Sequence, residues 1–110
     1  MNVNNLNREI FNITEAIRQA IPAERIYLFG SYAYGTPNED SDYDFFVVLP
    51  DGGIKPIDAM QKARKAMISL KRQTPVDIIA DYQSRFYDRS KYNTLERKVV
   101  NDGVVLYERA

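Results

Sequence analysis

The chain has 110 residues, and its fifteen basic residues balance its fifteen acidic ones. This length suits a single domain over residues 1–110, with one sheet and a few covering helices. The balanced charge gives no strong signal for nucleic-acid binding. No apolar run is long enough for a membrane span, and the polar amino terminus lacks the apolar core of a secretory signal. We therefore expect a cytoplasmic protein.

The chain contains neither cysteine nor histidine. Disulfides and thiolate metal sites are therefore excluded, and any bound metal would be held by oxygen ligands, which suit Mg²⁺ or Mn²⁺. Histidine is the usual general base of enzymes, so this group is also missing. Carboxylates are left as the candidates for proton transfer.

The amino-terminal half predicts a helix, a strand and a loop in that order. Apolar residues spaced by three and four positions predict an amphipathic helix over residues 6–20, which Pro22 ends. Residues 25–29 form a short apolar run stopped by Gly30, and this pattern predicts a buried strand. One helical turn is expected over residues 31–35. Turn-forming residues then predict a surface loop over residues 36–41.

The next segment predicts a strand, a helix and another strand. Residues 44–49 are the most hydrophobic stretch and predict a central strand. A second amphipathic helix is indicated by five apolar residues that we expect to face inward, namely Ile57, Met60, Ala63, Met67 and Leu70. Its outer face would be cationic, with Lys62, Arg64, Lys65, Lys71 and Arg72. Residues 76–80 predict a third strand.

The carboxyl-terminal part predicts two helical pieces and an edge strand. The helical pieces lie within residues 84–102 and are separated around residues 90–93. In the second piece we expect Leu95, Val99 and Val100 to face inward, with Gly103 closing the helix. Residues 104–107 would form the last strand. The element order predicts a single α/β or α+β domain.

Three carboxylates stand at the beginnings of predicted strands. Asp42 and Asp44 are two positions apart, so on a strand both would point to one face. Asp77 lies inside an apolar segment, where a carboxylate is expected to be paired, hydrogen-bonded or metal-bound. If the two strands are neighbours, all three carboxylates can meet. Their mutual repulsion would be relieved by divalent cations, which can clamp both oxygens of a nucleotidyl transfer.

Gly30 and Ser31 supply a candidate phosphate site next to these carboxylates. A glycine at the end of a strand allows the backbone to approach a phosphate closely. The helical turn that follows would offer free N–H donors, and Ser31 adds a hydroxyl group. Taken alone, Gly30-Ser31 is usually just a turn, the Asp42 and Asp44 fragment is more often capping and solvation, and Asp77 could equally be a hydrogen-bonded strand residue. Their occurrence together, each at one of the two ends of a predicted strand, favours a nucleotide site.

The order Gly30-Ser31, ten residues, then Asp42-Tyr43-Asp44 resembles the signature of the DNA polymerase β-type nucleotidyltransferase superfamily. Within it, the chain is most similar to the minimal nucleotidyltransferase group. Asp77 matches the third carboxylate of the family. The resemblance implies a mixed sheet of about four strands flanked by helices. It also implies that Asp42, Asp44 and Asp77 bind two Mg²⁺ ions and that Gly30 and Ser31 hold the β- and γ-phosphates of ATP or another NTP.

The same resemblance implies a reaction and a partner. A hydroxyl group would attack the α-phosphorus of the nucleotide, Asp77 would help to deprotonate it, and pyrophosphate would leave. Small members of the family commonly pair with a helical HEPN-type toxin and act as its antitoxin by adenylylating a tyrosine of that toxin. The short chain would leave the acceptor surface to such a partner, in a hetero-oligomer of undetermined stoichiometry.

Two other functions remain open from the sequence. The chain could transfer a nucleotide to a small molecule, as aminoglycoside nucleotidyltransferases do, although it would lack their additional acceptor domain. It could also be a non-catalytic subunit that neutralises its partner by occlusion. Neither the acceptor nor the nucleotide base is encoded in the motif residues.

Overall fold

The computed structural model describes residues 3–71 and 74–110, with side chains from Arg8 onward. Arg72 of the predicted cationic face lies outside the described residues. The helices are α1 (Val3–Ala20), α2 (Ser31–Tyr34), α3 (Pro56–Ala66), α4 (Gln83–Arg89) and α5 (Leu95–Asp102). The strands are β1 (Arg25–Phe29), β2 (Tyr43–Leu49), β3 (Val76–Tyr82) and β4 (Val104–Glu108). Every predicted element is present, and the boundaries of β1 match the prediction.

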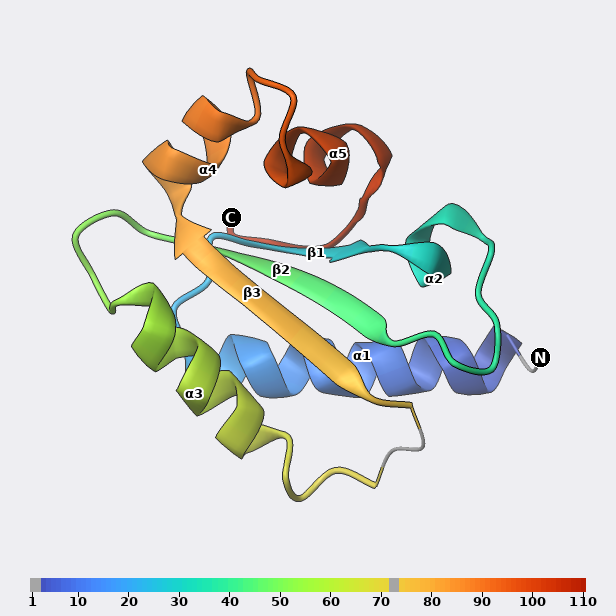
Figure 1. Ribbon diagram of the computed structural model, residues 1–110. Coiled ribbons are helices and arrows are strands. Elements are labelled where there is room, and N and C mark those ends of the chain that lie inside the picture. The colour runs from blue at the N-terminus through green and yellow to red at the C-terminus, as the bar shows by residue number, and fades with distance from the viewer. Residues whose placement is uncertain (1–2, 72–73) are drawn as a thin grey trace.

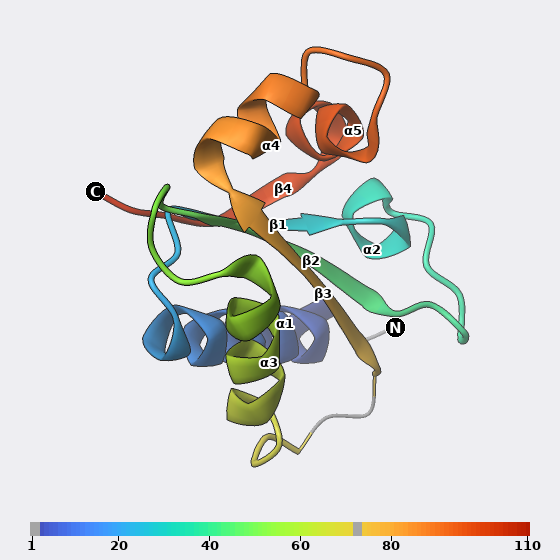
Figure 2. The ribbon, with the colours of Figure 1, turned by 60° about the vertical axis from the view of Figure 1, so that its left-hand side comes forward.

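The four strands form one mixed sheet in the order β3-β2-β1-β4. Strand β1 pairs antiparallel with both β2 and β4, whereas β2 and β3 are parallel and are connected through α3. Helices α1 and α3 cover one face of the sheet, and α4 and α5 lie on the other (Figures 1 and 2). This arrangement confirms the expected mixed sheet flanked by helices.

The larger core lies between the sheet and the α1 and α3 layer. Isoleucines along α1 at spacings of three and four form its buried stripe, as the periodicity predicts: Ile10, Ile13, Ile17 and the following Ile21. From the sheet, alternate residues of β1 and β2 meet this stripe, including Leu28 and Phe45. The remaining residues of these strands consequently point to the opposite face.

The smaller core lies under α4 and α5 and is mainly aromatic. Phe86 of α4 is fully buried, and its ring centroid lies 4.7 Å from that of Phe46 and 5.6 Å from that of Tyr27. Val99 of α5 is also fully buried against this group. These contacts fix both helices over β1 and β2, but leave the beginnings of β2 and β3 uncovered (Figure 1).

Three residues that were predicted to face inward, in two helices, are exposed. In α5, Leu95 and Val100 are exposed, with accessible fractions of 42% and 39%, and only Val99 of the predicted trio is buried. The helix is rotated so that the Glu96 carboxylate packs inward, 2.7 Å from Arg89 Nε of α4. In α3, Ile57 is 55% exposed, and Ala59 occupies the buried position instead. An inward-facing glutamate that pairs with a partly exposed arginine cannot be found from a pattern that counts only apolar residues.

The second helix also ends earlier than its apolar pattern predicts. Helix α3 ends at Ala66, and Met67 is its C-cap residue. Met67 is nevertheless buried against the larger core, while Leu70 is partly buried beyond the helix. Within the described residues, no helix combines the length and the apolar character needed to cross a membrane.

Candidate functional site

Gly30 follows the last residue of β1 in a conformation that favours glycine. Its backbone angles are φ 77° and ψ −164°, a region that residues with a Cβ atom rarely occupy. A Cβ atom built at this position would overlap Asp44 Oδ2 and lie 3.1 Å from Asp44 Cγ. The carboxylate of Asp44 therefore fills the space that the missing side chain leaves. The glycine is therefore packed directly against the acidic motif.

Asp44 and Asp77 lie side by side in the sheet. They are register partners in the parallel pair of β2 and β3, and Phe29 is the partner of Asp44 on β1. The neighbours of Asp44 in β2, Tyr43 and Phe45, face the α1 and α3 layer. Asp44 therefore points to the opposite face, near the end of the sheet that α4 and α5 leave open.

Asp42 lies immediately before β2 and its side chain is exposed. The half-buried position of Asp44 raises the pKa of its carboxyl group, and the negative charges of Asp77 and Asp42 raise it further. Both neighbours are thus close enough to repel the Asp44 charge. The three carboxylates share one end of the sheet, as their positions in the sequence predict.

The carboxylates do not form a closed ligand cage. Across residues 3–71 and 74–110, no group of three or more acidic side chains is arranged to hold a metal ion by itself. Asp77 is also exposed rather than embedded in the core, so burial alone does not require a partner for it. The apolar flanks of Asp77 are misleading because the parallel strand begins at the open end of the sheet.

Ser31 contacts the loop that leads to the aspartates. Its hydroxyl donates to Ser41 Oγ over 3.0 Å, and the backbone N–H of Asn38 also donates to Ser41 Oγ over 2.9 Å. The bond between Ser31 and Ser41 connects the start of α2 to the residue that precedes Asp42. The role of Ser41 as a bridge was missed from the sequence, where a serine directly before the acidic motif was the only available signal.

The sequence profile of the nucleotidyltransferase domain family matches residues 10–101, which include every candidate site residue. The chain belongs to this family. It is a nucleotidyltransferase, a class of enzyme that generally uses an NTP and a divalent metal ion. A search of curated proteins found no match.

Solved structures similar to this nucleotidyltransferase share its fold. One, from Sulfolobus solfataricus and provisionally assigned as a nucleotidyltransferase, is 25% identical with a TM-score of 0.61, covering 91% of this chain and 78% of that chain. A toxin–antitoxin structure with AMP-PNP is 27% identical with a TM-score of 0.58, covering 90% and 73%. A toxin–antitoxin MntA–HpeT variant, with two aspartates two positions apart changed to glutamate, is 28% identical with a TM-score of 0.58, covering 89% and 72%.

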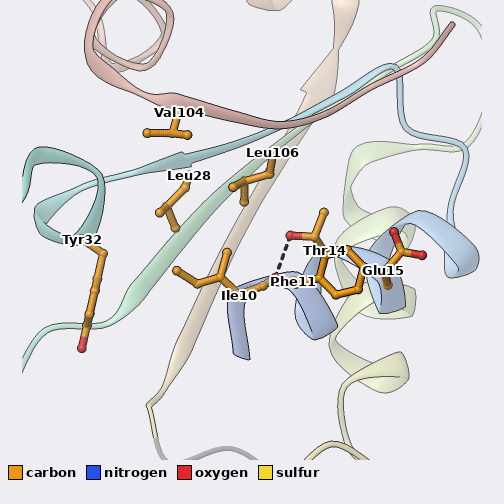
Figure 3. Close-up of a pocket in the computed structure, with 8 residues that line it drawn as sticks. All are labelled: Ile10, Phe11, Thr14, Glu15, Leu28, Tyr32, Val104 and Leu106. Carbon is orange, nitrogen blue, oxygen red and sulfur yellow. Dashed lines mark hydrogen bonds between the residues drawn. The ribbon is translucent and has the colours of Figure 1, made fainter. Parts of the chain in front are cut away.

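A hollow on this nucleotidyltransferase lies away from the acidic motif. It has a volume of about 390 Å³ and is lined mainly by apolar side chains of α1, β1, α2 and β4 (Figure 3). Leu28 lines it from the face of the sheet that packs on α1, whereas Asp44 points to the other face. Phe11 at its border is 62% exposed. The hollow therefore does not belong to the candidate nucleotide site.

Replacing Asp77 with asparagine is expected to stabilise the metal-free nucleotidyltransferase at neutral pH. The substitution removes a charge that raises the pKa of Asp44, so ionising Asp44 in the folded state becomes easier. Asp77 is exposed and solvent screens its charge, so we expect a gain of roughly 0.5 kcal/mol in the free energy of unfolding. Thermal unfolding in EDTA measures this gain.

The pH dependence gives the control for this experiment. A carboxyl group with a raised pKa in the folded state binds more protons there than in the unfolded chain, so stability increases as the pH falls through the folded-state pKa. The benefit of Asp77→Asn should therefore shrink in acid, where Asp44 is protonated. A gain that is independent of pH would contradict the proposed repulsion.

Proposed function

We propose that this nucleotidyltransferase transfers AMP from ATP to a hydroxyl group of a protein partner and acts as an antitoxin. The single observation that carries the proposal is the close contact between Gly30 and Asp44, in which the carboxylate occupies the space beside the glycine. This contact supports the proposal because it brings the candidate phosphate loop next to the acidic motif, and a transfer reaction needs its reacting groups held close together.

The residues at this end of the sheet fit divalent cations. All the candidate ligands are carboxylate oxygens, the donor type that Mg²⁺ prefers. Burial raises the pKa of Asp44, and the negative charges of Asp77 and Asp42, which a cation would neutralise, raise it further. We assign Asp42, Asp44 and Asp77 as ligands of two Mg²⁺ ions. Bound metal would supply charge stabilisation for the phosphates and for the attacking and leaving oxygens.

The protein's own residues would orient the reactants. Gly30 allows the backbone to approach the β- and γ-phosphates, and Ser31 would direct its hydroxyl to them after release from Ser41. The acceptor oxygen would form a bond to the α-phosphorus while the bond between the α-phosphorus and the bridging oxygen breaks. Pyrophosphate then leaves with that oxygen. Asp77, exposed at the open end, would take the proton of the acceptor hydroxyl.

The proposed acceptor is a tyrosine of a small helical HEPN-type toxin. Two of the similar structures are toxin–antitoxin complexes, one of them with AMP-PNP. In the other, the two substituted aspartates have the spacing of Asp42 and Asp44 in this chain. These likenesses support a protein acceptor and an adenine nucleotide. Because the reaction consumes ATP, we assign it to the cytoplasm.

The test is to express the chain with a candidate partner, namely a small helical protein encoded by a neighbouring gene, and to measure the partner's intact mass after incubation with Mg²⁺ and ATP. We expect a gain of one adenylyl group, located by peptide mapping on a tyrosine, and no gain in EDTA. An unchanged partner that is nevertheless bound and inactive would instead support neutralisation by occlusion. Modification of an aminoglycoside in the absence of the partner would support the small-molecule alternative.

A further inference from the structure

A lysine of α5 reaches the helical turn that follows Gly30. The ammonium nitrogen of Lys98 lies 5.2 Å from the centroid of the Tyr34 ring. Tyr34 is the last residue of α2, which begins at Ser31. An ammonium group within about 6 Å of an aromatic face is attracted by the ring. The contact therefore brings a positive charge from the carboxyl-terminal part of the chain to the candidate phosphate loop.

Backbone packing fixes the position of α5 next to this loop. A Cβ atom at Gly103 would lie 2.5 Å from Val99 O and 3.1 Å from Leu28 O, so the glycine permits close approach of α5 to β1. Leu28 is only two residues before Gly30. Val99, adjacent to Lys98, is fully buried. In both ribbon views the end of α5 lies near α2 (Figures 1 and 2).

The charge of Lys98 is available to a ligand. Cations of α4 and the segment after it pair with carboxylates, as Arg85 does with Asp81 and Arg89 with Glu96. Within the part of the chain that the structure describes, Lys98 has no such ion pair. Its neighbour is the ring of Tyr34, which attracts a cation without neutralising it.

The ring is the part of Tyr34 that matters for this contact. The Tyr34 hydroxyl oxygen is buried and has no hydrogen-bond partner among the described residues. A buried polar atom without a partner destabilises the folded state. The hydroxyl thus adds no stabilising contact, whereas the ring faces the ammonium group of Lys98.

We infer that Lys98 binds the terminal phosphates of the nucleotide and that the Tyr34 ring holds its ammonium group beside the phosphate loop. The inference rests on the proposed function, because it names a substrate contact of the same site. Ser31 and Tyr34 are the first and last residues of α2 and lie about 4.5 Å apart along its axis, so a change of the Lys98 rotamer would move the ammonium group from the ring toward the phosphates. Lysine binds phosphate as a flexible point charge. Its charge would offset the repulsion between the triphosphate and the acidic motif.

Calorimetric binding of a non-hydrolysable ATP analogue and of AMP, each with Mg²⁺, tests the assignment. In Lys98→Ala we expect the Kd of the ATP analogue to rise about 10-fold, the effect of losing one charge-assisted contact. The Kd of AMP should not change, because AMP lacks the terminal phosphates. Arg97→Ala is the matched control, since it removes the adjacent exposed cation of α5 and should leave both affinities unchanged.

Conservative variants separate the contact from a structural role. Lys98→Arg and Tyr34→Phe should retain the affinity for the ATP analogue, whereas Tyr34→Leu should weaken it. The assignment would be overturned if Lys98→Ala weakened the affinity for both ligands equally or changed neither affinity. The proposed function would still stand in that case, provided that the wild-type protein binds the ATP analogue. A wild-type protein that binds no ATP analogue would overturn both.

Discussion

Replacing Asp42 and Asp44 together with asparagine is expected to reduce nucleotidyl transfer by about 10³-fold or more, because both proposed metal ligands lose their charge. Asparagine has the same shape as aspartate, so the sheet should persist. The measurement is single-turnover transfer to the partner at saturating Mg²⁺ and ATP. Burial and the charges of Asp77 and Asp42 oppose ionisation of Asp44, so the metal-free double variant should unfold at a temperature no lower than the parent.

Asp40→Asn is the matched control for this experiment. Asp40 is exposed on the loop two residues before Asp42, and the charges that raise the pKa of Asp44 are those of Asp77 and Asp42. We expect transfer close to that of the parent. Transfer by the double variant at the parental rate would refute the role of the acidic motif, as would equal loss in Asp40→Asn.

Replacing Gly30 with alanine is expected to lower transfer by about 10²-fold or more, because a small misplacement of reacting groups costs rate on this scale. The new Cβ atom would overlap Asp44 Oδ2 and force the carboxylate or the loop to move. The positive φ of 77° adds strain, and we expect a stability loss of about 1–3 kcal/mol. Activity normalised to folded protein, with thermal unfolding alongside, measures both effects.

Gly52→Ala is the control that introduces backbone strain without a clash at the candidate site. Gly52 also has a positive φ, of 74°, but a Cβ atom there meets no heavy atom within 4 Å. This variant should lose stability by about 1 kcal/mol, the usual cost of a left-handed conformation for a residue with a side chain. Its transfer rate should match that of the parent. If Gly30→Ala transfers as fast as Gly52→Ala, the contact with Asp44 has no catalytic importance.

The sequence was sufficient to predict elements whose local signals agree. The strand Arg25–Phe29 is an apolar run that a glycine stops, and the structure has the same boundaries. The apolar stripe of α1 was equally clear, because isoleucines recur at helical spacing. At the site, the order of Gly30 and the two aspartates along the chain already indicated that a loop connects them.

Contacts between residues that are far apart in the sequence could not be predicted from the sequence pattern. The register that pairs Asp44 with Asp77 depends on how β3 docks beside β2, and no local signal encodes that choice. The close approach of Gly30 to Asp44 is likewise a contact across the sheet. The inward position of Glu96 required knowledge of Arg89 on the preceding helix. In each case a tertiary partner, rather than local propensity, determines the outcome.

The most direct test of nucleotidyl transfer uses ATP labelled at either the α- or the γ-phosphate, with the co-purified partner and Mg²⁺. We expect the α-label to remain covalently on the partner and the γ-label to be released as pyrophosphate. The variant with Asp42→Asn and Asp44→Asn should show neither event. Transfer of the γ-label to the partner would contradict the account, because it would identify a phosphoryl rather than a nucleotidyl transfer.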